Sequence, residues 1–470
     1  MTDQANAQVL DAEVEQALYA KREKIYPRQV SGLFARLRAL AVIALLGGYY
    51  FVPWLQWGGR QAVLFDLPAR KFYILGVVIW PQDLIYLTAM LIISALSLFF
   101  FTALAGRLWC GYACPQTVWT EAFMWIERKI EGDRAKRMKL DKQPWSWKKL
   151  SIKSSKHAAW LAFALWTGFT FVGYFTPIRD LADRLFPYAW GGWETFWVLF
   201  YSFATYGNAG WLREQVCIYM CPYARFQSAM IDKDTLIVSY DVERGEPRGA
   251  RRRTADLKQA KLGHCIDCSI CVQVCPTGID IRDGLQYQCI GCAACIDACD
   301  EVMDKMGYPR GLVRYTTEHA LEGNPTKILR LRVLIYAGIL FALTVAVGWS
   351  LFVRDTTALD VIRDRNSLFR ETMDGLIENV YTLKLINKDA HAHTYRVSVH
   401  GLPNLVMKTD HETSEVAAGE VVEYPVRVQV EPNALNERSV DLRFVLSADD
   451  DPSIQIVEEA RFVGPRPGEW

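Results

Sequence analysis

Cys265-Ile-Asp-Cys268-Ser-Ile-Cys271-Val-Gln-Val-Cys275-Pro276 and Cys289-Ile-Gly-Cys292-Ala-Ala-Cys295-Ile-Asp-Ala-Cys299 are two runs with one cysteine spacing. This spacing is typical of two-cluster ferredoxins, in which each run gives three thiolates to one cubane and one thiolate to the other. We therefore predict two [4Fe-4S] clusters. Their ligands are Cys265, Cys268, Cys271 and Cys299 for cluster one, and Cys289, Cys292, Cys295 and Cys275 for cluster two.

Disulfide bonds and zinc are the alternatives for these cysteines. Zinc sites rarely repeat an x2-x2-x3 spacing, and a disulfide framework gives no reason for such regularity. All 12 cysteines of the chain fall in short motifs and none follows Cys299, which favours redox ligands in a reducing compartment. Asp300 stands where a proline follows the first run, which changes a turn but removes no ligand.

The composition indicates a membrane protein. Of the 470 residues, 51% are hydrophobic and 13% are aromatic, which is too apolar for an ordinary soluble protein. A transmembrane helix needs about 20 apolar residues. We predict five spans, at 39–57, 84–105, 158–177, 195–212 and 333–353. The fourth is the shortest, and a buried soluble helix is its alternative.

Two further segments are too polar or too short to be spans. The apolar segment Phe72–Trp80 is predicted as an interfacial or re-entrant piece. The N-terminus is polar and mixed in charge, so no removable signal peptide is predicted.

Positive charge predicts the orientation of the spans. Residues 107–156, between the second and third spans, carry 12 Lys and Arg, whereas the next loop carries only Arg179 and Arg184. Cytoplasmic loops are rich in Lys and Arg. The first loop is therefore predicted to be cytoplasmic. By alternation the N-terminus and the ferredoxin-like insert are cytoplasmic too, and the C-terminal region is outside.

A second cysteine pattern ends both predicted helical hairpins. Cys110-x3-Cys114-Pro115 ends the first and Cys217-x3-Cys221-Pro222 the second, so both reach the same interface. Cysteines four residues apart share a helix face, and the following proline disfavours helix at the second cysteine. Such sulfurs suit a soft metal, and buried structural cysteines are the alternative. We predict copper, and the reactive thiols, at Cys110, Cys114, Cys217 and Cys221.

Beyond residue 354 the sequence changes to a period of two. Apolar and polar residues alternate in 380–386, 394–399, 421–430 and 440–446. Short alternating strands in this number predict an immunoglobulin-like β-sandwich. His391 and His393 could bind an external metal, but an ordinary exposed pair is the better interpretation.

Several cofactor classes are not expected. The sequence shows no glycine fingerprint or P-loop for a nicotinamide or nucleotide. Only His157 lies at the edge of a predicted span, whereas a transmembrane haem needs two axial histidines.

In this order the features resemble the FixG/CcoG family of cytochrome c oxidase accessory proteins. The resemblance rests on both C-x3-C-P motifs, the double ferredoxin motif, the late fifth span and the C-terminal sandwich, and it covers nearly the whole chain. It implies a bacterial inner-membrane cupric reductase that converts Cu(II) to Cu(I) for assembly of cbb(3)-type cytochrome c oxidase. The C-x3-C-P cysteines would then act on copper, and the C-terminal domain would be periplasmic.

The predicted organisation is multi-domain. A cytoplasmic N-terminal segment precedes a membrane domain with four transmembrane helices. A cytoplasmic domain follows, with its two-cluster module at about 263–300, and then a fifth transmembrane helix and the all-β sandwich. The bounds of these five parts are 1–38, 39–212, 213–332, 333–353 and 354–470.

Two other functions stay open from the sequence. Quinol dehydrogenases of nitrate and nitrous-oxide respiration combine similar motifs, although the external sandwich argues against that function. A non-catalytic copper-binding assembly scaffold would leave the two clusters without a purpose.

The expected partners are membrane lipid, copper, a cytoplasmic electron donor, and oxidase subunits or copper chaperones at the periplasmic domain. Nucleic acid is not expected, and a homodimer is left open.

Overall fold

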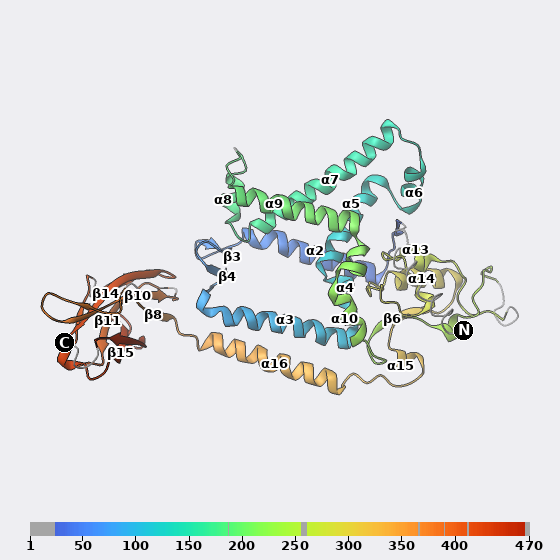
Figure 1. The fold of residues 1–470 in the computed structure, drawn as a ribbon. Coiled ribbons are helices and arrows are strands. Elements are labelled where there is room, and N and C mark those ends of the chain that lie inside the picture. The colour runs from blue at the N-terminus through green and yellow to red at the C-terminus, as the bar shows by residue number, and fades with distance from the viewer. Residues whose placement is uncertain are drawn as a thin grey trace, which may run out of the picture. The chain divides into compact units, whose positions relative to one another are not determined.

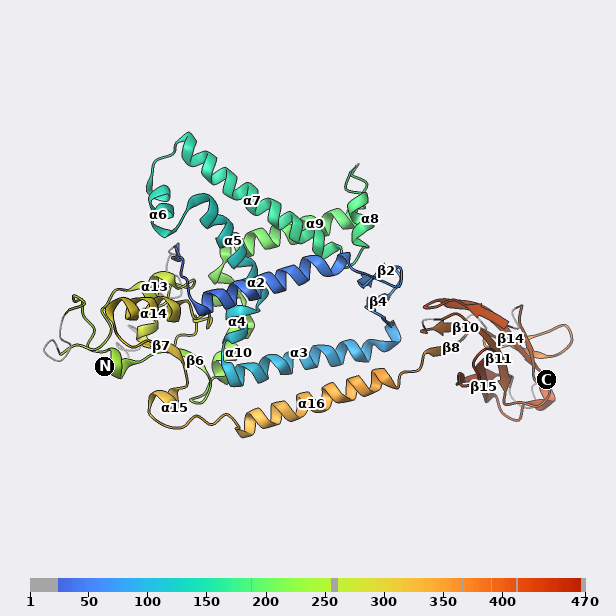
Figure 2. The same cartoon turned by 180° about the vertical axis from the view of Figure 1, so that it is seen from behind.

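The computed structural model describes residues 24–186, 188–254, 261–364, 367–389, 391–410 and 413–465. Most of the predicted N-terminal segment, residues 1–23, lies outside them. The chain forms two compact units, residues 1–344 and 345–470, and the boundary falls within helix α16 (Leu331–Phe352). Figures 1 and 2 show the elements of both units from opposite sides.

Three helices in the described part of the chain are long and apolar enough to cross a membrane. They are α2 (Leu33–Phe51), which a turn extends to Trp54, α3 (Leu84–Ala105) and α16. Each segment has 22 residues, and a bilayer core needs about 20. None of the most apolar window of α3 is buried inside the protein, which suits a helix that faces lipid. These helices correspond to the first, second and fifth predicted spans.

The prediction of five spans is wrong by this measure. Helix α7 (Trp147–Val172) has 26 residues, but four of its first ten are lysines. Helix α9 (Gly192–Thr205) has only 14 residues before the backbone widens into the π-helical segment η3 (Tyr206–Leu212). Figure 1 shows α7 and α9 side by side. A Cβ on Gly168 of α7 would lie 2.4 Å from the carbonyl oxygen of Val198, so glycine permits this close packing.

Short strands connect α2 to α3. Phe72–Trp80, predicted as an interfacial or re-entrant piece, forms two antiparallel strands joined by a turn at Leu75 and Gly76, so the re-entrant alternative is wrong and the interfacial one stays a prediction. A buried Gln61 ties this region to the end of α7 through a hydrogen bond from Nε2 to the carbonyl oxygen of Gly173 (2.7 Å). The strands are β1 (Gln56–Trp57), β2 (Arg60–Gln61), β3 (Val63–Asp66), β4 (Lys71–Ile74) and β5 (Val77–Ile79).

The basic region 107–156 is folded, and some of its cations are internal. Arg137 and Lys156 are buried, and both contact the buried carboxylate of Glu127, at 2.9 and 3.9 Å. The helices of this region and its repeat are α4 (Leu108–Tyr112), α5 (Pro115–Glu131), α6 (Arg134–Lys142), α8 (Ile178–Asp183), the π-helical η4 (Val216–Met220) and α10 (Pro222–Met230).

The ferredoxin-like module is built on one strand pair and two short helices. Strands β6 (Ile237–Tyr240) and β7 (Val313–Thr316) pair antiparallel, so the chain before and after the cysteines meets in one sheet. Buried Ile281, Ile296 and Met303 form its core with these strands. The remaining elements are α11 (Val242–Gly245), α13 (Ile270–Val274), η5 (Ile281–Asp283), α14 (Ala294–Met306) and α15 (Glu318–Leu321).

The C-terminal unit is a β-sandwich, as predicted. One sheet has the order β12-β14-β10-β8, with β9 on β10, and the other has the order β13-β11-β15-β16. Alternate residues of β14, from Tyr424 to Val430, are buried against Tyr381 and Phe444. All four predicted strands are present, within β10, β11, β14 and β15. The strands are β8 (Thr357–Arg363), β9 (Arg370–Glu371), β10 (Ile377–Asn387), β11 (His393–His400), β12 (Val406–Lys408), β13 (Thr413–Val416), β14 (Val421–Val430), β15 (Ser439–Ala448) and β16 (Gln455–Val463).

Candidate redox centre

The eight cysteines of the ferredoxin-type runs surround two small cavities. The cysteines lining the first cavity are the set predicted for cluster one: Cys265, Cys268, Cys271 and Cys299. The second cavity is lined by the set predicted for cluster two, together with Cys271: Cys275, Cys289, Cys292 and Cys295. The fourth cysteine of each run therefore lies at the cavity of the other run.

The two runs repeat in conformation as well as in spacing. Ser269, after the second cysteine of the first run, has φ 53°, and Ala293 at the same place in the second run has φ 58°. Non-glycine residues rarely adopt this left-handed conformation. Each residue starts a helix, α13 or α14, that carries the third cysteine of its run. Each loop thus curls around a cavity and turns its cysteines inward.

The surroundings of the cysteines fit [4Fe-4S] clusters. Cysteine thiolates are the usual ligands of these clusters. The walls are otherwise mainly apolar, with residues such as Val302 and Met303 at the first cavity. Arg282 also lines this cavity, and it pairs with Asp267 and Asp280, both at 2.6 Å. The negative charge of these two carboxylates is therefore partly neutralised beside the cysteines.

The first C-x3-C-P motif breaks the helix at its second cysteine, as the proline predicts. Cys110 lies in α4, Cys114 is extended with ψ 128°, and Pro115 begins α5. The amide of Cys114 donates to the carbonyl oxygen of Trp109, five residues earlier, at 2.9 Å.

The second motif has the same design. Cys217 lies in the π-helical η4, Cys221 is extended with ψ 110°, and Pro222 begins α10. The amide of Cys221 donates to the carbonyl oxygen of Val216, again five residues earlier, at 2.8 Å. The weak sequence repeat is therefore a structural repeat.

The structure brings the four motif cysteines together. Each thiol lies within electrostatic range of the other three. Burial, followed by the Cys114 thiol, raises the pKa of Cys110 to about 11, and burial with the other thiols raises the pKa of Cys217 to about 12. In the described residues no three Cys, His, Asp or Glu side chains, the eight ferredoxin-type cysteines included, lie close enough to hold a single metal ion.

The first motif rests directly on the loop of cluster two. Gly111 is buried, and a Cβ there would lie 2.9 Å from the Cα of Cys292 and 2.9 Å from the carbonyl oxygen of Gly291. Tyr315 fixes the same loop by donating to the carbonyl oxygen of Gly291 at 2.5 Å. The absence of a side chain at Gly111 therefore allows the cluster-two loop to touch the helix that carries Cys110.

Arg107 links the two cysteine systems. It is buried beyond the end of α3, and it donates to the carbonyl oxygens of Cys289 (3.2 Å) and Ala224 (2.9 Å). Its guanidinium lies within electrostatic range of four thiols: Cys110, Cys289, Cys217 and Cys221. A buried cation here favours the anionic forms of the surrounding groups.

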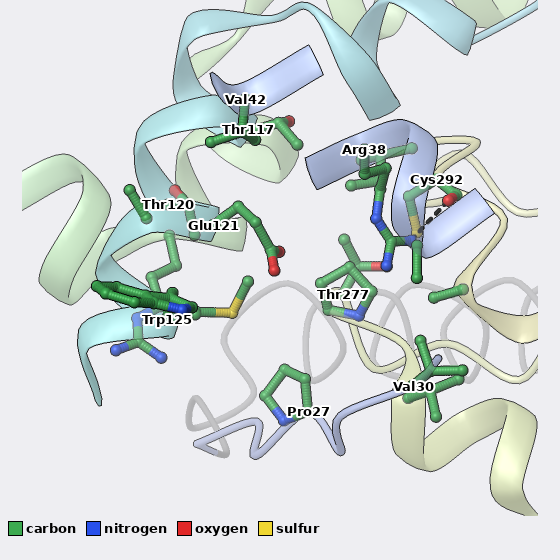
Figure 3. Close-up of a pocket in the computed structure, with 18 of the residues that line it drawn as sticks. Pro27, Val30, Arg38, Val42, Thr117, Thr120, Glu121, Trp125, Thr277 and Cys292 are labelled. Atoms are coloured by element: carbon green, nitrogen blue, oxygen red, sulfur yellow. Dashed lines mark hydrogen bonds between the residues drawn. The ribbon is translucent and has the colours of Figure 1, made fainter. Parts of the chain in front are cut away.

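A cavity of about 530 Å³ lies beside both sites. Its wall comes from α2, α5, the N-terminal residues 25–30, the segment before the second motif and the cluster-two loop. Cys217 and Cys292 both line it. Figure 3 shows the carboxylate of Glu121 and the guanidinium of Arg38 turned toward the same space.

Sequence reasoning missed the polar residues that support the motifs. Gln227 of α10 is fully buried and accepts a hydrogen bond from Sγ of Cys110 at 3.3 Å, which joins the two repeats. Arg213 pairs with Glu127 at 3.0 Å. The sequence contains a pattern that could have indicated the two arginines, because one stands shortly before each motif. Arg107 precedes Cys110 by three residues, and Arg213 precedes Cys217 by four.

The two histidines of the sandwich do not form the exposed pair that the sequence predicts. The side chain of His391 is 84% exposed, but that of His393 is 9% exposed and contacts Asp450 at 2.7 Å. The interpretation is therefore wrong for His393, because β11 begins at this residue and turns its side chain toward the carboxylate of Asp450, two residues after the end of β15.

Profiles of three protein families match the chain. They are a "4Fe-4S dicluster domain" over residues 212–318, a "4Fe-4S binding domain" over 87–132, and an "IG-like fold at C-terminal of FixG" over 347–465. The last description names FixG as a candidate oxidoreductase. The match over 87–132 contains two cysteines, Cys110 and Cys114.

Similar proteins span most of the chain. The nitrogen fixation protein FixG of Rhizobium meliloti is 39% identical over 439 residues, covering 84% of this chain and 83% of that protein. The protein RdxB of Cereibacter sphaeroides is 42% identical over 419 residues, covering 85% and 87%. A crystal structure of a FixG-related protein from Vibrio parahaemolyticus is 34% identical, with a TM-score of 0.22, and covers 23% of this chain and 96% of that one.

Proposed function

Since this chain belongs to the FixG family, a family of membrane-associated iron–sulfur electron-transfer proteins, we propose that it reduces Cu(II) to Cu(I) at Cys110, Cys114, Cys217 and Cys221. The Cu(I) would serve assembly of a cbb(3)-type cytochrome c oxidase. Copper is the substrate in this proposal, and the iron–sulfur groups are resident cofactors.

One observation carries the proposal: the helix of the first motif packs on the loop of cluster two through Gly111. A bound [4Fe-4S] cluster supplies one electron at a time. Cys292 of its predicted ligand set lies in the loop that α4 touches, so a short path leads toward Cys110. Soft thiolates prefer Cu(I) over harder cations.

The residues around the four thiols have distinct roles in this proposal. The four cysteines bind copper, and Gln227 holds Sγ of Cys110 in place. The charge of Arg107 lies close enough to stabilise both the motif thiolates and the Cys289 thiolate. Arg107 is therefore a positioning residue, because its guanidinium acts through the cysteines.

The membrane orientation is part of the proposal. The N-terminus and the ferredoxin-like module are cytoplasmic, and the sandwich is periplasmic in a bacterial inner membrane. The 12 Lys and Arg of residues 107–156 support this orientation. The predicted orientation is the same with three spans as with five. Leaving out both α7 and α9 removes two crossings, so every later segment stays on the same side of the membrane.

The test uses the purified full-length protein without oxygen. The protein is reduced with dithionite, freed of the reductant and mixed with Cu(II), and Cu(I) is measured with a colorimetric chelator while the cluster signals are followed by EPR. The wild type should release one Cu(I) for each electron lost. Replacing all four motif cysteines by Ala should abolish Cu(I) formation and leave the iron–sulfur EPR signals intact. Retained copper turnover in that variant would overturn the proposal.

A second candidate places a third [4Fe-4S] cluster at the same four cysteines. The description of the family matching residues 87–132 favours it, since its two cysteines belong to the first motif. Iron analysis separates the two candidates. Two clusters give eight iron atoms per chain by stoichiometry, and three give 12. The four-Ala variant would lose a third of its iron only if the motif cysteines hold a cluster.

A further inference from the structure

The 530 Å³ cavity has the size and lining of a small-molecule site. Its wall combines apolar residues with a few polar groups that converge from different elements, which is the usual make-up of such sites. A copper ion at Cys217 would occupy only a small part of this volume, so most of the cavity is left for a separate ligand.

One wall belongs to a candidate membrane span. Ala39, Val42 and Ile43 lie on one face of α2 and line the cavity. Residues three and four apart share a helix face, so this stripe continues the cavity along the apolar helix. A ligand with a long apolar tail fits such a site, because its tail would lie along a helix that crosses the lipid.

The opposite wall is polar and charged. Glu121 and Arg128 of α5 form an ion pair at 3.0 Å, and the Glu121 side chain is 29% exposed. Arg38 of α2 faces Glu121 across the space in Figure 3, and Thr117 and Thr120 lie near Glu121. The α5 wall and Arg38 of α2 together offer a carboxylate that accepts a hydrogen bond and several groups that donate one.

The cavity also touches the redox residues. Arg38 donates from Nη1 to the carbonyl oxygen of Cys292 at 2.7 Å, and Thr277 lines the cavity two residues after Cys275. A ring bound between Glu121 and Arg38 would therefore lie against the loop of cluster two. Such a ligand should carry electrons, an apolar tail, and oxygens that both donate and accept hydrogen bonds.

We propose that this cavity binds the ring of an isoprenoid quinol, with one ring hydroxyl donating to Glu121 and the other ring oxygen accepting from Arg38. The role of this quinol as electron donor rests on the proposed function, but its binding does not. Oxidation of one quinol to quinone releases two electrons and two protons. The [4Fe-4S] clusters that the two cysteine sets would hold supply two one-electron acceptors when bound, while Glu121 would take one proton and water the other.

The test measures binding before any turnover. The full-length protein in phosphatidylcholine nanodiscs is labelled with a photoreactive azido-quinone, and the labelled peptides are mapped by mass spectrometry. The label should fall on residues 117–128 and 25–43, and excess decyl-ubiquinone should prevent it. Label elsewhere, or label that excess quinone does not displace, would overturn the proposal.

Matched variants on α2 make the test specific. Val42→Trp fills the cavity, and should weaken quinone competition by about tenfold or more, because the indole would occupy the space of the quinone ring. Leu40→Trp is the control, because Leu40 is 64% exposed and does not line the cavity. Equal quinone affinity in Val42→Trp and the wild type would contradict the site. Glu121→Gln offers a second check, and its affinity for the quinol should fall more than its affinity for the quinone.

Two results separate this inference from the proposed function. If dithionite-reduced protein reduces copper but no quinone binds, the inference fails and the proposed function stands. If the quinol binds and is oxidised but Cu(II) is not reduced, the cavity assignment stands and the copper proposal fails.

Discussion

The two C-x3-C-P motifs share one backbone design but differ in what holds them. In both, the amide of the second cysteine bonds to the carbonyl five residues earlier and a proline starts the next helix. The first motif packs on the cluster-two loop through Gly111. The second motif has Ile218 at the place of Gly111, so it lacks the position that allows this close backbone contact. Instead, Arg213 anchors it to Glu127, and Cys217 lines the large cavity.

This difference indicates a division of labour between two copies of one element. The first copy lies where electrons would arrive from the iron–sulfur module. The second copy is held by the buried ion pair between Arg213 and Glu127, and its Cys217 lines the large cavity. The repeat therefore supplies similar sulfur pairs, and their different neighbours would give each pair its place in the proposed electron path.

The largest expected effect comes from removing one sulfur pair at a time. We predict that Cys110→Ser with Cys114→Ser, and separately Cys217→Ser with Cys221→Ser, each reduce cupric reduction to background, because all four thiols lie together. Removing both pairs should cost no more than removing one, since residues that act as a unit are not additive. Single-turnover Cu(I) formation measures this. A pair variant with the wild-type rate would show that the motifs form two independent sites.

The next largest effect should follow from breaking the support of the second motif. Glu127 is buried and contacts Arg137 (2.9 Å) and Arg213 (3.0 Å). We predict that Glu127→Ala lowers the free energy of unfolding by about 3–5 kcal/mol, because it leaves buried cations without a partner. Denaturant unfolding in detergent would measure the loss. Glu318→Ala is the control, since its ion pair with Lys233 is more than half exposed and should contribute at most about 1 kcal/mol.

The carboxylate of Glu127 also makes the stability of the protein depend on pH. Burial alone would raise the pKa of Glu127, but the Arg213 and Arg137 charges outweigh it and hold the pKa below its ordinary value of 4.5. A lowered folded-state pKa adds stability above the unfolded-state value, and this stability is lost as the pH falls through the folded-state pKa. We therefore expect wild-type stability to fall below pH 4.5, and the Glu127→Gln variant to show a flatter profile. Parallel profiles would contradict this.

A smaller effect is expected from a substitution that disturbs the first motif alone. Gly111→Ala places a Cβ 2.9 Å from backbone atoms of the cluster-two loop, and such overpacking costs about 1–3 kcal/mol. We predict that reoxidation of the clusters by Cu(II) slows, as seen by stopped-flow absorbance, while Cu(I) binding to the second pair persists. Gly207→Ala is the control, because a Cβ there meets no atom within 4 Å. Equal rates for both variants would show that the α4 contact carries no electrons.

The sequence predicts local features of this protein well. The spacing of eight cysteines gives the two sets that line the two small cavities, and alternation finds four strands of the sandwich. Proline after Cys114 and Cys221 predicts the break in each helix. All of these depend on residues a few positions apart, for which spacing is sufficient evidence.

What the sequence does not give depends on contacts between distant segments. Residues 158–177 and 195–212 are apolar enough to suggest spans. Only the structure shows that α7 already begins at Trp147 and so includes four lysines, and that α9 ends in a π-helical segment. Gly111 and Cys292 are far apart in the chain, so no local pattern could show that they touch. The sequence therefore predicts the ligands, and the structure shows which ligands are neighbours.

The smallest effect concerns how the cluster-two loop is held against the membrane helices. Asp297, between the last two cysteines of its run, accepts hydrogen bonds from the amides of Phe34 (3.2 Å) and Ala35 (2.7 Å) and so caps α2. We predict that Asp297→Asn costs about 0.3–1 kcal/mol, since a neutral cap interacts less well with the helix dipole. Hydrogen exchange of residues 33–36 should become faster, and Cu(I) formation should slow slightly. Asp304→Asn on the same helix, where the carboxylate pairs with the exposed Arg310, should leave both measurements unchanged. If Asp297→Asn affects exchange at the second motif as strongly as at the first, the two copies are not held independently, and the division of labour between them is wrong.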